Sequence, residues 1–151
     1  MNNFIVPLQI RWSDIDANRH LRHSVYYDYG AFCRMKLFTE IGITLGKLDE
    51  LSIGPVLLRE EAVFRREIVF EDQISMTTEV LKATADFGRW AFRHTLIKND
   101  GILAAVITID GAWIDTQKRK MTKPPIEFHD AFEKIPKAAE FETIVLTKKE
   151  V

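Results

Sequence analysis

Cysteine is almost absent from this sequence. Its 151 residues include 1 cysteine, Cys33, which excludes an intramolecular disulfide. A nearly thiol-free chain without disulfides is typical of a reducing compartment, so we expect a cytoplasmic protein. No internal repeat or low-complexity segment interrupts the chain.

An excess of either charge is also missing. The chain has 21 Lys and Arg residues against 22 Asp and Glu residues, for a formal net charge of -1. Phosphate backbones select basic surfaces, so this balance argues against nucleic acid as a partner. No apolar run approaches the length of a membrane span, and the amino end, MNNFIVPLQIRW, lacks a basic region and a small-residue cleavage site. We therefore expect a soluble, unprocessed protein with no membrane partner.

The hydrophobic periodicity predicts one α+β domain over residues 1–151. FIVPLQIRW, rich in β-branched and aromatic residues, predicts a first strand. From Ser24, a candidate N-cap, apolar residues recur at steps of three and four up to Gly42, which predicts a helix. Alternating patterns then predict strands over 56–70, 74–80 and 90–96, and KNDG predicts a hairpin turn before the two-sided apolar strand ILAAVITIDGAWID. One long helix followed by antiparallel strands indicates a sheet that packs on the helix.

The stretch DIDAN places three oxygen-bearing side chains at alternate positions, as a calcium loop does. These are Asp14, Asp16 and Asn18. An EF-hand loop counted from Asp14 requires glycine at its sixth position and glutamate at its twelfth, where this chain has Arg19 and Val25. The three remaining oxygen ligands are too few for calcium, so these side chains need another explanation.

Three segments carry a family resemblance. RWSDIDANRHLRHSVYYDY is similar to the strand, D-x-D loop and helix start of hotdog-fold acyl-CoA thioesterases of the 4-hydroxybenzoyl-CoA thioesterase-like branch, and closer still to the D-x-N-x-H signature of plant acyl-ACP thioesterases. GPVLLREEAVFRREIVFEDQI resembles the family's second strand and turn. AWIDTQKRKMTKPP resembles its closing strand. The resemblance ends near Pro125, and the extension from about residue 126 is unassigned.

The resemblance implies a hotdog fold, in which a long central helix is enclosed by a curved antiparallel sheet. It further implies homodimers or homotetramers with acyl-thioester sites between protomers, and no cofactor or metal. The family's catalytic acid corresponds to Asp16, and the acyl-ACP signature adds Asn18 and His20. The backbone N–H that faces the thioester carbonyl falls near His23 and Ser24. We also expect Tyr26, in the first turn of the helix, to contact substrate.

Physical chemistry supports these roles. Thioester hydrolysis needs a carboxylate, as nucleophile or as base for water, and a fixed dipole for the negative charge that develops on the carbonyl oxygen. A helix that begins near Ser24 presents unpaired N–H groups and a partial positive charge, so it can polarise a carbonyl without a metal. The sequence thus predicts a catalytic loop in front of a helix N-terminus.

Other interpretations apply to several single residues. Asp14 is expected to cap the loop through local hydrogen bonds. The spacing of His20 and His23 suggests zinc, but no third ligand is suitably spaced. His94 is expected to be a hydrogen-bonded core histidine, and Cys33 to be a packing residue.

Acids and arginines on the predicted strands leave further possibilities open. Glu60 interrupts an apolar strand pattern, which indicates a bulge or an edge charge, while some relatives place a second acid, here Glu60 or Glu61, near the thioester. Four arginines are candidates for contacts with coenzyme A phosphates, although charged strand faces are usually only solvated: Arg65, Arg66, Arg89 and Arg93.

The function predicted from the sequence is hydrolysis of an acyl-CoA or acyl-ACP thioester to free acid and thiol. The alternative is a hotdog protein that binds acyl thioesters without hydrolysing them, as a carrier or regulatory module. A dehydratase on the same fold is less favoured, because its usual active-site histidine has a different helix context. The sequence leaves acyl length and the choice between CoA and acyl carrier protein open.

Overall fold

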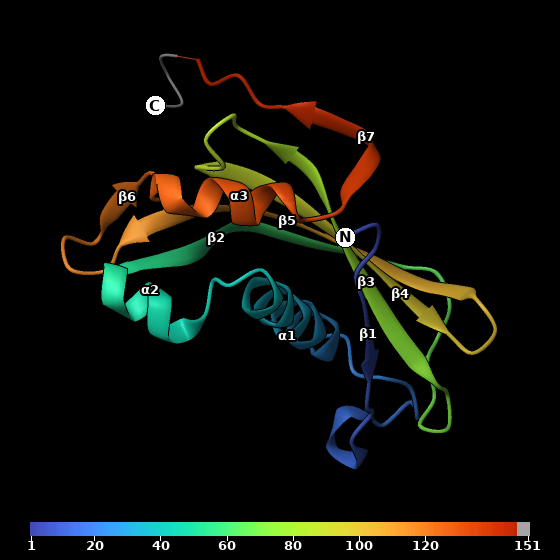
Figure 1. Ribbon diagram of the computed structural model, residues 1–151. Helices are drawn as coiled ribbons and strands as arrows, with labels where there is room; N and C mark the ends of the chain where they lie inside the picture. The colour runs from blue at the N-terminus through green and yellow to red at the C-terminus, as the bar shows by residue number, and fades with distance from the viewer. Residues whose placement is uncertain (148–151) are drawn as a thin grey trace.

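The structure is a computed structural model, and it describes residues 1–147. In this structure a seven-stranded sheet curves around one long helix (Figure 1). The helical elements are η1 (Trp12–Asp14), α1 (Val25–Glu40), α2 (Leu45–Leu51), η2 (Ile126–Phe128) and α3 (His129–Glu133). The strands are β1 (Ile5–Leu8), β2 (Ile53–Phe64), β3 (Ile74–Ala83), β4 (Arg89–Lys98), β5 (Ile102–Asp115), β6 (Lys120–Thr122) and β7 (Lys137–Thr143).

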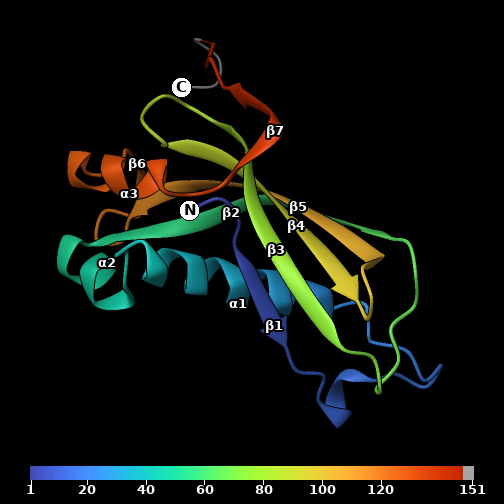
Figure 2. The same cartoon turned by 45° about the vertical axis from the view of Figure 1, so that its right-hand side comes forward.

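The strands follow the order β1-β3-β4-β5-β2, with β6 on β5 and β7 on β3. All pairs are antiparallel except β3 with β7. In two views α1 lies along the concave face of this sheet (Figures 1 and 2). The predicted α+β architecture, a central helix enclosed by a curved antiparallel sheet, is therefore confirmed. Among the described helices none is long and apolar enough to cross a membrane.

Helix α1 forms where the sequence pattern predicts it. Tyr26, Tyr29, Cys33 and Leu37, spaced by three or four residues, are all buried against the sheet. The helix ends just before Gly42, whose φ of +92° lies in the left-handed region that glycine adopts without strain. Burial raises the pKa of the Cys33 thiol to about 12, in keeping with a packing residue.

Several local predictions were wrong. Ser24 occupies the N-cap position before Val25, as predicted, but its backbone angles are helical and its side chain caps no backbone N–H. Instead its hydroxyl accepts a hydrogen bond from the Arg22 guanidinium. The first strand ends at Leu8, and β2 ends at Phe64 rather than near residue 70. The short helix α2 was missed because seven residues carry too little periodicity to stand out.

The bulge suggested by the broken pattern near Glu60 is present in β2. The register between β2 and β5 shifts between Leu57 and Arg59, so the alternation changes phase two residues earlier than the sequence indicated. The predicted hairpin turn joins β4 to β5. There Asn99 and Gly101 have φ values of 50° and 83°, as tight turns require.

The unassigned extension packs onto the rest of the chain. Strand β7 pairs with β3, and α3 inserts Phe132, which is 1% exposed, into the core. The Phe132 ring stacks on Phe87 with a centroid distance of 4.5 Å and lies 5.8 Å from Trp113. The extension thus covers the end of the core opposite the acidic loop (Figures 1 and 2).

Candidate functional site

The loop before α1 is a small closed turn. An isolated bridge joins Ile15 to Leu21, and the backbone N–H of Asp16 donates to the carbonyl of His20 at 2.9 Å. Arg19, with a φ of 65°, makes the reversal by adopting the left-handed conformation. The loop is therefore closed by its own backbone and needs no calcium ion.

One carboxylate oxygen of Asp16 is held and the other is available. Oδ1 accepts hydrogen bonds from the backbone N–H groups of Asn18 at 2.8 Å and His20 at 3.4 Å. Within residues 1–147 no hydrogen bond involves Oδ2, and Asp16 is partly exposed. The carboxylate is thus oriented by the loop while one anionic oxygen remains free to meet water or a substrate.

Glu67 is a member of this site that the sequence reasoning missed. Its Oε2 lies 2.8 Å from Nε2 of His20, and both side chains are substantially exposed. Glu67 lies between β2 and β3, far from the loop in sequence. It was one acid among several in FRREIVFEDQ, and no spacing linked it to His20. The pair fixes the ring of His20, and with a neutral imidazole Nε2 carries the proton and Nδ1 stays an acceptor.

The start of α1 supplies free backbone donors. Val25 donates its N–H to the carbonyl of Arg22 at 3.0 Å. Within the described part of the chain, the N–H groups of His23 and Ser24 take part in no hydrogen bond. Two unpaired donors at the positive end of a 16-residue helix can stabilise a developing oxyanion.

A cavity of about 320 Å³ joins the loop to the helix start. It brings together four of the six predicted site residues, Asp16, His20, His23 and Tyr26, with Arg65, Arg66 and Glu67. Asn18 and Ser24 do not line it. Asn18 is exposed, and its backbone N–H holds the Asp16 carboxylate.

Tyr26 forms part of the cavity's apolar wall. It is 4% exposed, and its ring meets that of Phe64 edge to face at a centroid distance of 4.9 Å. Burial, together with the nearby Asp16 charge, raises the pKa of Tyr26, so the phenol stays protonated at neutral pH.

A second cavity, of about 630 Å³, meets the first at Asp16. It is lined on its apolar side by Trp12, Ile15, Val69 and Phe70. Among residues 1–147, Asp16 alone lines both cavities. Asp16 therefore borders a mainly apolar space and a space with two arginines.

Asp14 has a structural role, as predicted. It is fully buried, and its carboxylate accepts hydrogen bonds from the Arg11 backbone at 2.9 Å, the Arg11 guanidinium at 3.0 Å and the Tyr29 hydroxyl at 3.3 Å. Burial raises the pKa of Asp14, but the Arg11 hydrogen bonds outweigh burial and hold this pKa below its usual range. Asp14 thus ties the loop to the strand end and to α1.

This lowered pKa predicts an acid-dependent loss of stability. A group whose pKa is lower in the folded state contributes stability above its unfolded pKa, about 3.9, and loses it as the pH falls through the folded value. We expect the difference in free energy of unfolding between the wild type and Asp14→Asn to be largest at pH 7 and to shrink at pH 3. Urea unfolding at both pH values measures it. An unchanged difference would show that the Asp14 charge does not stabilise the fold.

Most of the other candidates lie away from this site. Glu60 approaches Arg34 at 3.9 Å, Glu61 pairs with Arg59, and neither acid lines the two cavities. His94 is fully buried between the Arg34 guanidinium at 3.0 Å and the Thr78 hydroxyl at 2.8 Å, which confirms the predicted core histidine.

Burial and the Arg34 charge lower the pKa of His94 to about 3, so its ring is neutral. Arg93 pairs with Glu79 and Glu140, away from the loop. Arg89 lines a groove of about 580 Å³ beside β7, at the other end of the molecule (Figure 1). Within residues 1–147 no group of three or more His, Cys, Asp or Glu side chains is placed to hold a metal ion.

Solved structures of low sequence identity share this fold. The Staphylococcus aureus protein SAV2348, solved in complex with CoA, is 20% identical with a TM-score of 0.82, over 97% of this chain and 90% of that one. The DHNA-CoA thioesterase from Staphylococcus aureus is 16% identical with a TM-score of 0.80, over 89% and 91% of the two chains. Slr0204, a 1,4-dihydroxy-2-naphthoyl-CoA thioesterase from Synechocystis, is 13% identical with a TM-score of 0.77, over 87% and 96%. These similarities confirm the hotdog fold.

No curated protein sequence matches the chain. The family model of the thioesterase-like superfamily, in contrast, matches residues 10–135, which include the acidic loop, α1 and the strands from β2 to β6. The match extends past Pro125 into α3, beyond the segments that carried the resemblance in the sequence. The chain belongs to the thioesterase-like superfamily.

Proposed function

We propose that this protein hydrolyses an acyl thioester of CoA or acyl carrier protein to a free acid and a thiol, with Asp16 as its central catalytic residue. One observation carries the proposal: the 320 Å³ cavity places an oriented carboxylate beside the two residues that precede α1, His23 and Ser24, whose N–H groups are free within the described part of the chain. A carboxylate and an oxyanion donor are the two components that thioester hydrolysis requires.

The reaction can follow either of two routes from this geometry. In the first, the free oxygen of Asp16 takes a proton from water while the water oxygen attacks the thioester carbonyl carbon. In the second, the same oxygen attacks the carbon and water then hydrolyses the mixed anhydride. In both routes the free N–H of His23, which lines the cavity, stabilises the oxyanion, and the carbon–sulfur bond breaks to release a thiolate.

His20 positions the reacting groups. Its backbone N–H holds Oδ1 of Asp16, and its ring is oriented by Glu67. The ring lines the cavity beside Asp16, so its free nitrogen can hold the attacking water. Glu67 is a positioning residue, because it acts through the His20 ring.

A thiol-release assay over short, long and aromatic acyl-CoAs tests the proposal. We expect release from at least one of them, abolished in Asp16→Asn. Two backbone hydrogen bonds to Oδ1 also fit a simple turn residue, which is the observation that favours a non-hydrolytic binder. Saturable binding of acyl-CoA without thiol release would support that binder and refute the hydrolase.

Removal of the His20 ring should slow the reaction without loss of the fold. We expect His20→Ala to lower kcat by about 10²-fold, at the lower end of the range for general acid–base groups. Glu67→Gln should cost less, because the amide oxygen can still accept a hydrogen bond from Nε2. The split between kcat and KM in Glu67→Gln separates the roles: a positioning residue lowers kcat at unchanged KM and melting temperature, and a merely structural one lowers the melting temperature.

The assembly we propose is a homodimer, or a tetramer of two such dimers. In the sequence, the strand that is apolar on both faces, now β5, suggested such an assembly. In the structure β5 lies inside the sheet between β4 and β2. One edge of the described sheet is β2, where Leu57, Leu58, Val63 and Phe64 are 45%, 50%, 40% and 51% exposed. An exposed apolar edge usually pairs with another chain. Light scattering at micromolar concentration would contradict this if it showed a monomer.

A further inference from the structure

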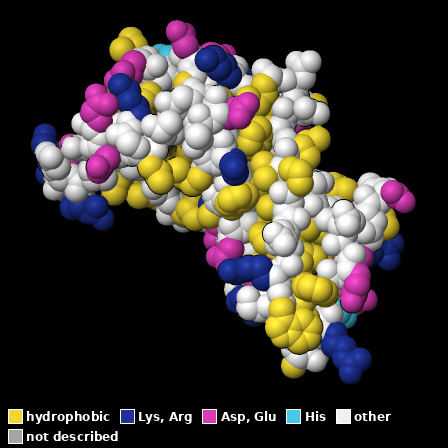
Figure 3. Space-filling view, turned by 60° about the horizontal axis from the view of Figure 1, so that its bottom comes forward, with side chains coloured by type: hydrophobic (Ala, Val, Ile, Leu, Met, Phe, Trp, Pro, Cys, Tyr) yellow, Lys and Arg dark blue, Asp and Glu magenta, His cyan; other side chains and the backbone are white. Residues whose placement is uncertain are grey.

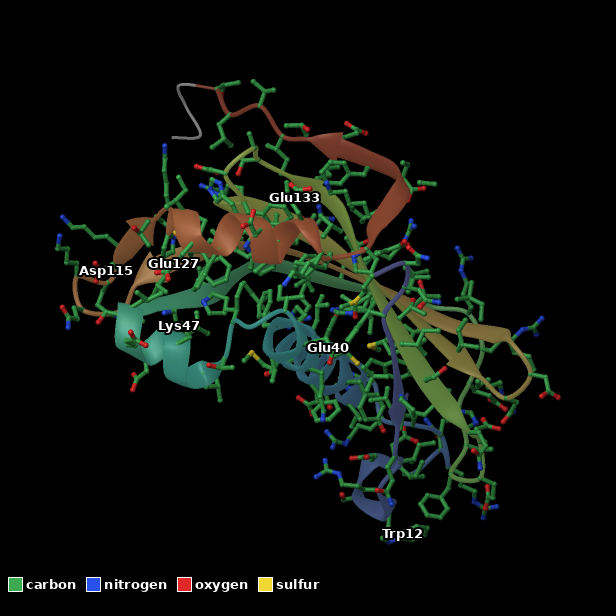
Figure 4. All side chains as sticks on the ribbon, viewed as in Figure 1. Trp12, Glu40, Lys47, Asp115, Glu127 and Glu133 are labelled. Atoms are coloured by element: carbon green, nitrogen blue, oxygen red, sulfur yellow. The ribbon has the colours of Figure 1, made fainter. Side chains whose placement is uncertain are left out.

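Trp12 is placed unusually for a tryptophan. It is 80% exposed, whereas the two other tryptophans, Trp90 and Trp113, are 2% and 0% exposed. Figure 4 shows it at the lower end of the molecule, pointing away from α1 and the sheet. In the space-filling view, hydrophobic side chains are exposed at the lower right end of the molecule, next to Lys and Arg side chains (Figure 3). A ring this exposed buries little apolar surface on folding.

A second exposed ring accompanies it. Phe70, 43% exposed, meets Trp12 edge to face with a centroid distance of 6.1 Å and an interplanar angle of 85°. Trp12 precedes the loop and Phe70 follows β2, so the tertiary fold brings the two rings together. They form walls of the 630 Å³ cavity, with Ile15 and Val69. Ser13, Arg19 and Glu71 also line this cavity and are polar.

The two cavities at Asp16 differ in character. The smaller one combines two arginines, two histidines and the acids Asp16 and Glu67 with three apolar or aromatic residues, Leu21, Tyr26 and Phe64. The larger one has four apolar residues, one arginine, one serine and the acids Asp16 and Glu71, so it is the more apolar of the two and has fewer basic side chains. A thioester of CoA has the same asymmetry, because its reacting carbonyl separates an apolar acyl chain from an arm that ends in phosphates.

We infer that the cavity between Trp12 and Phe70 takes the acyl group of the substrate, and that these two rings determine acyl preference. The inference rests on the proposed function, since it assumes that the reacting carbonyl lies at Asp16. The carrier arm then leaves through the cavity of Arg65 and Arg66, so that its phosphates lie further along the arm, beyond that cavity. Each half of the substrate then meets the cavity whose lining matches it better. The preferred substrate class is an acyl chain long enough to cover both rings.

Tryptophan fluorescence reports occupancy of this cavity without any need for turnover. The probe is S-octyl-CoA, a thioether that cannot be hydrolysed, with CoA itself as the probe that lacks an acyl group. Because Trp12 is the exposed tryptophan, its emission should shift to shorter wavelength when an octyl chain covers it. We expect a saturable shift with S-octyl-CoA, none with CoA, and none in Trp12→Phe, which keeps an apolar ring but loses the signal.

Calorimetry on the same samples separates the outcomes. Saturable binding of S-octyl-CoA with no change in emission would overturn the inference, because the chain would then lie elsewhere. Absence of binding would refute both this inference and the proposed function. A shift in a protein that releases no thiol from short, long or aromatic acyl-CoAs would uphold the acyl site and refute the hydrolase.

Kinetics supply a matched test. We expect Trp12→Ala to raise KM for octanoyl-CoA about 10-fold or more while KM for acetyl-CoA changes little, because a two-carbon acyl group does not reach the ring. Ile126→Ala is the control, since Ile126 is 82% exposed and lines neither cavity. Equal losses for both substrates in Trp12→Ala would assign the ring to the loop structure and overturn its role in acyl preference.

The cavity lined by Arg65 and Arg66 has a separate kinetic test. Arg65→Ala should raise KM for octanoyl-CoA but leave KM for the N-acetylcysteamine thioester of octanoate unchanged, because that thioester has no phosphate. Trp12→Ala should raise KM for both octanoyl thioesters. The reverse result would be a KM that depends on acyl length in Arg65→Ala and on the carrier in Trp12→Ala. It would place the acyl group in the cavity of Arg65 and overturn the assignment.

Discussion

Asp16→Asn should lower kcat by at least about 10²–10⁴-fold, the usual cost of losing a general base, and by more if Asp16 is the nucleophile. The substitution is isosteric, and the amide oxygen can keep the hydrogen bonds from Asn18 and His20 that now reach Oδ1. The change therefore removes the anionic oxygen but leaves the loop closed. Melting temperature and acyl-CoA affinity should stay near those of the wild type.

Two matched variants define the specificity of this effect. Asp14→Asn should reduce the melting temperature, because it removes a buried charge from Arg11, yet change kcat far less than Asp16→Asn does. Asn18→Ala should have an intermediate effect, about 10²–10³-fold at most, as for loss of one positioning group or oxyanion donor. Turnover of Asp16→Asn within a few fold of the wild type would make Asp16 a turn residue. A collapse of its melting temperature would show instead that the anionic charge stabilises the loop.

A labelled-water experiment distinguishes the two routes. If Asp16 is the nucleophile and water attacks the aspartyl carbonyl carbon of the anhydride, a single turnover in ¹⁸O-water leaves the label in the Asp16 side chain. Label in Asp16 therefore identifies the nucleophile. If Asp16 is the base, all the label appears in the released acid. Mass spectrometry of the peptide that contains Asp16 measures the difference.

Phe132→Ala should destabilise the fold by about 3–5 kcal/mol, the usual cost of emptying a core aromatic position. The ring is 1% exposed and lies among Phe87, Trp113 and Phe128, with centroid distances of 4.5, 5.8 and 5.9 Å. Truncation leaves a hole in this cluster that the neighbouring rings cannot fill without moving. The variant tests our proposal that residues 1–151 form one domain with the extension as an integral part.

Phe141→Ala is the comparison within the same extension. Phe141 is partly exposed on β7, and its ring meets the Lys137 ammonium at 5.1 Å. An exposed cation–π contact contributes about 0.5–1 kcal/mol, so this variant should lose far less stability. Urea unfolding followed by circular dichroism gives both values. Similar small losses in the two variants would show that the extension is a peripheral attachment rather than part of the core.

The sequence by itself determined the local features of this protein. The three- and four-residue spacing of Tyr26, Tyr29, Cys33 and Leu37 is helical in any context, because the helix repeat brings such residues to one face. The order of one helix and several alternating segments likewise indicated the α+β class. The calcium loop could be excluded because its required glycine and glutamate positions are sequential.

Tertiary structure alone decided which distant residues share the site. Glu67 reaches His20, and Phe70 reaches Trp12, across more than forty positions of the chain, and no periodic pattern encodes such pairs. Side-chain partners in the fold also set the roles of single groups. The Ser24 hydroxyl accepts a hydrogen bond from Arg22 and caps no backbone N–H, and burial against Arg34 keeps His94 neutral. Periodicity records only which face of an element is buried. What that face meets depends on how the sheet curves around the helix, and the sequence pattern does not contain that information.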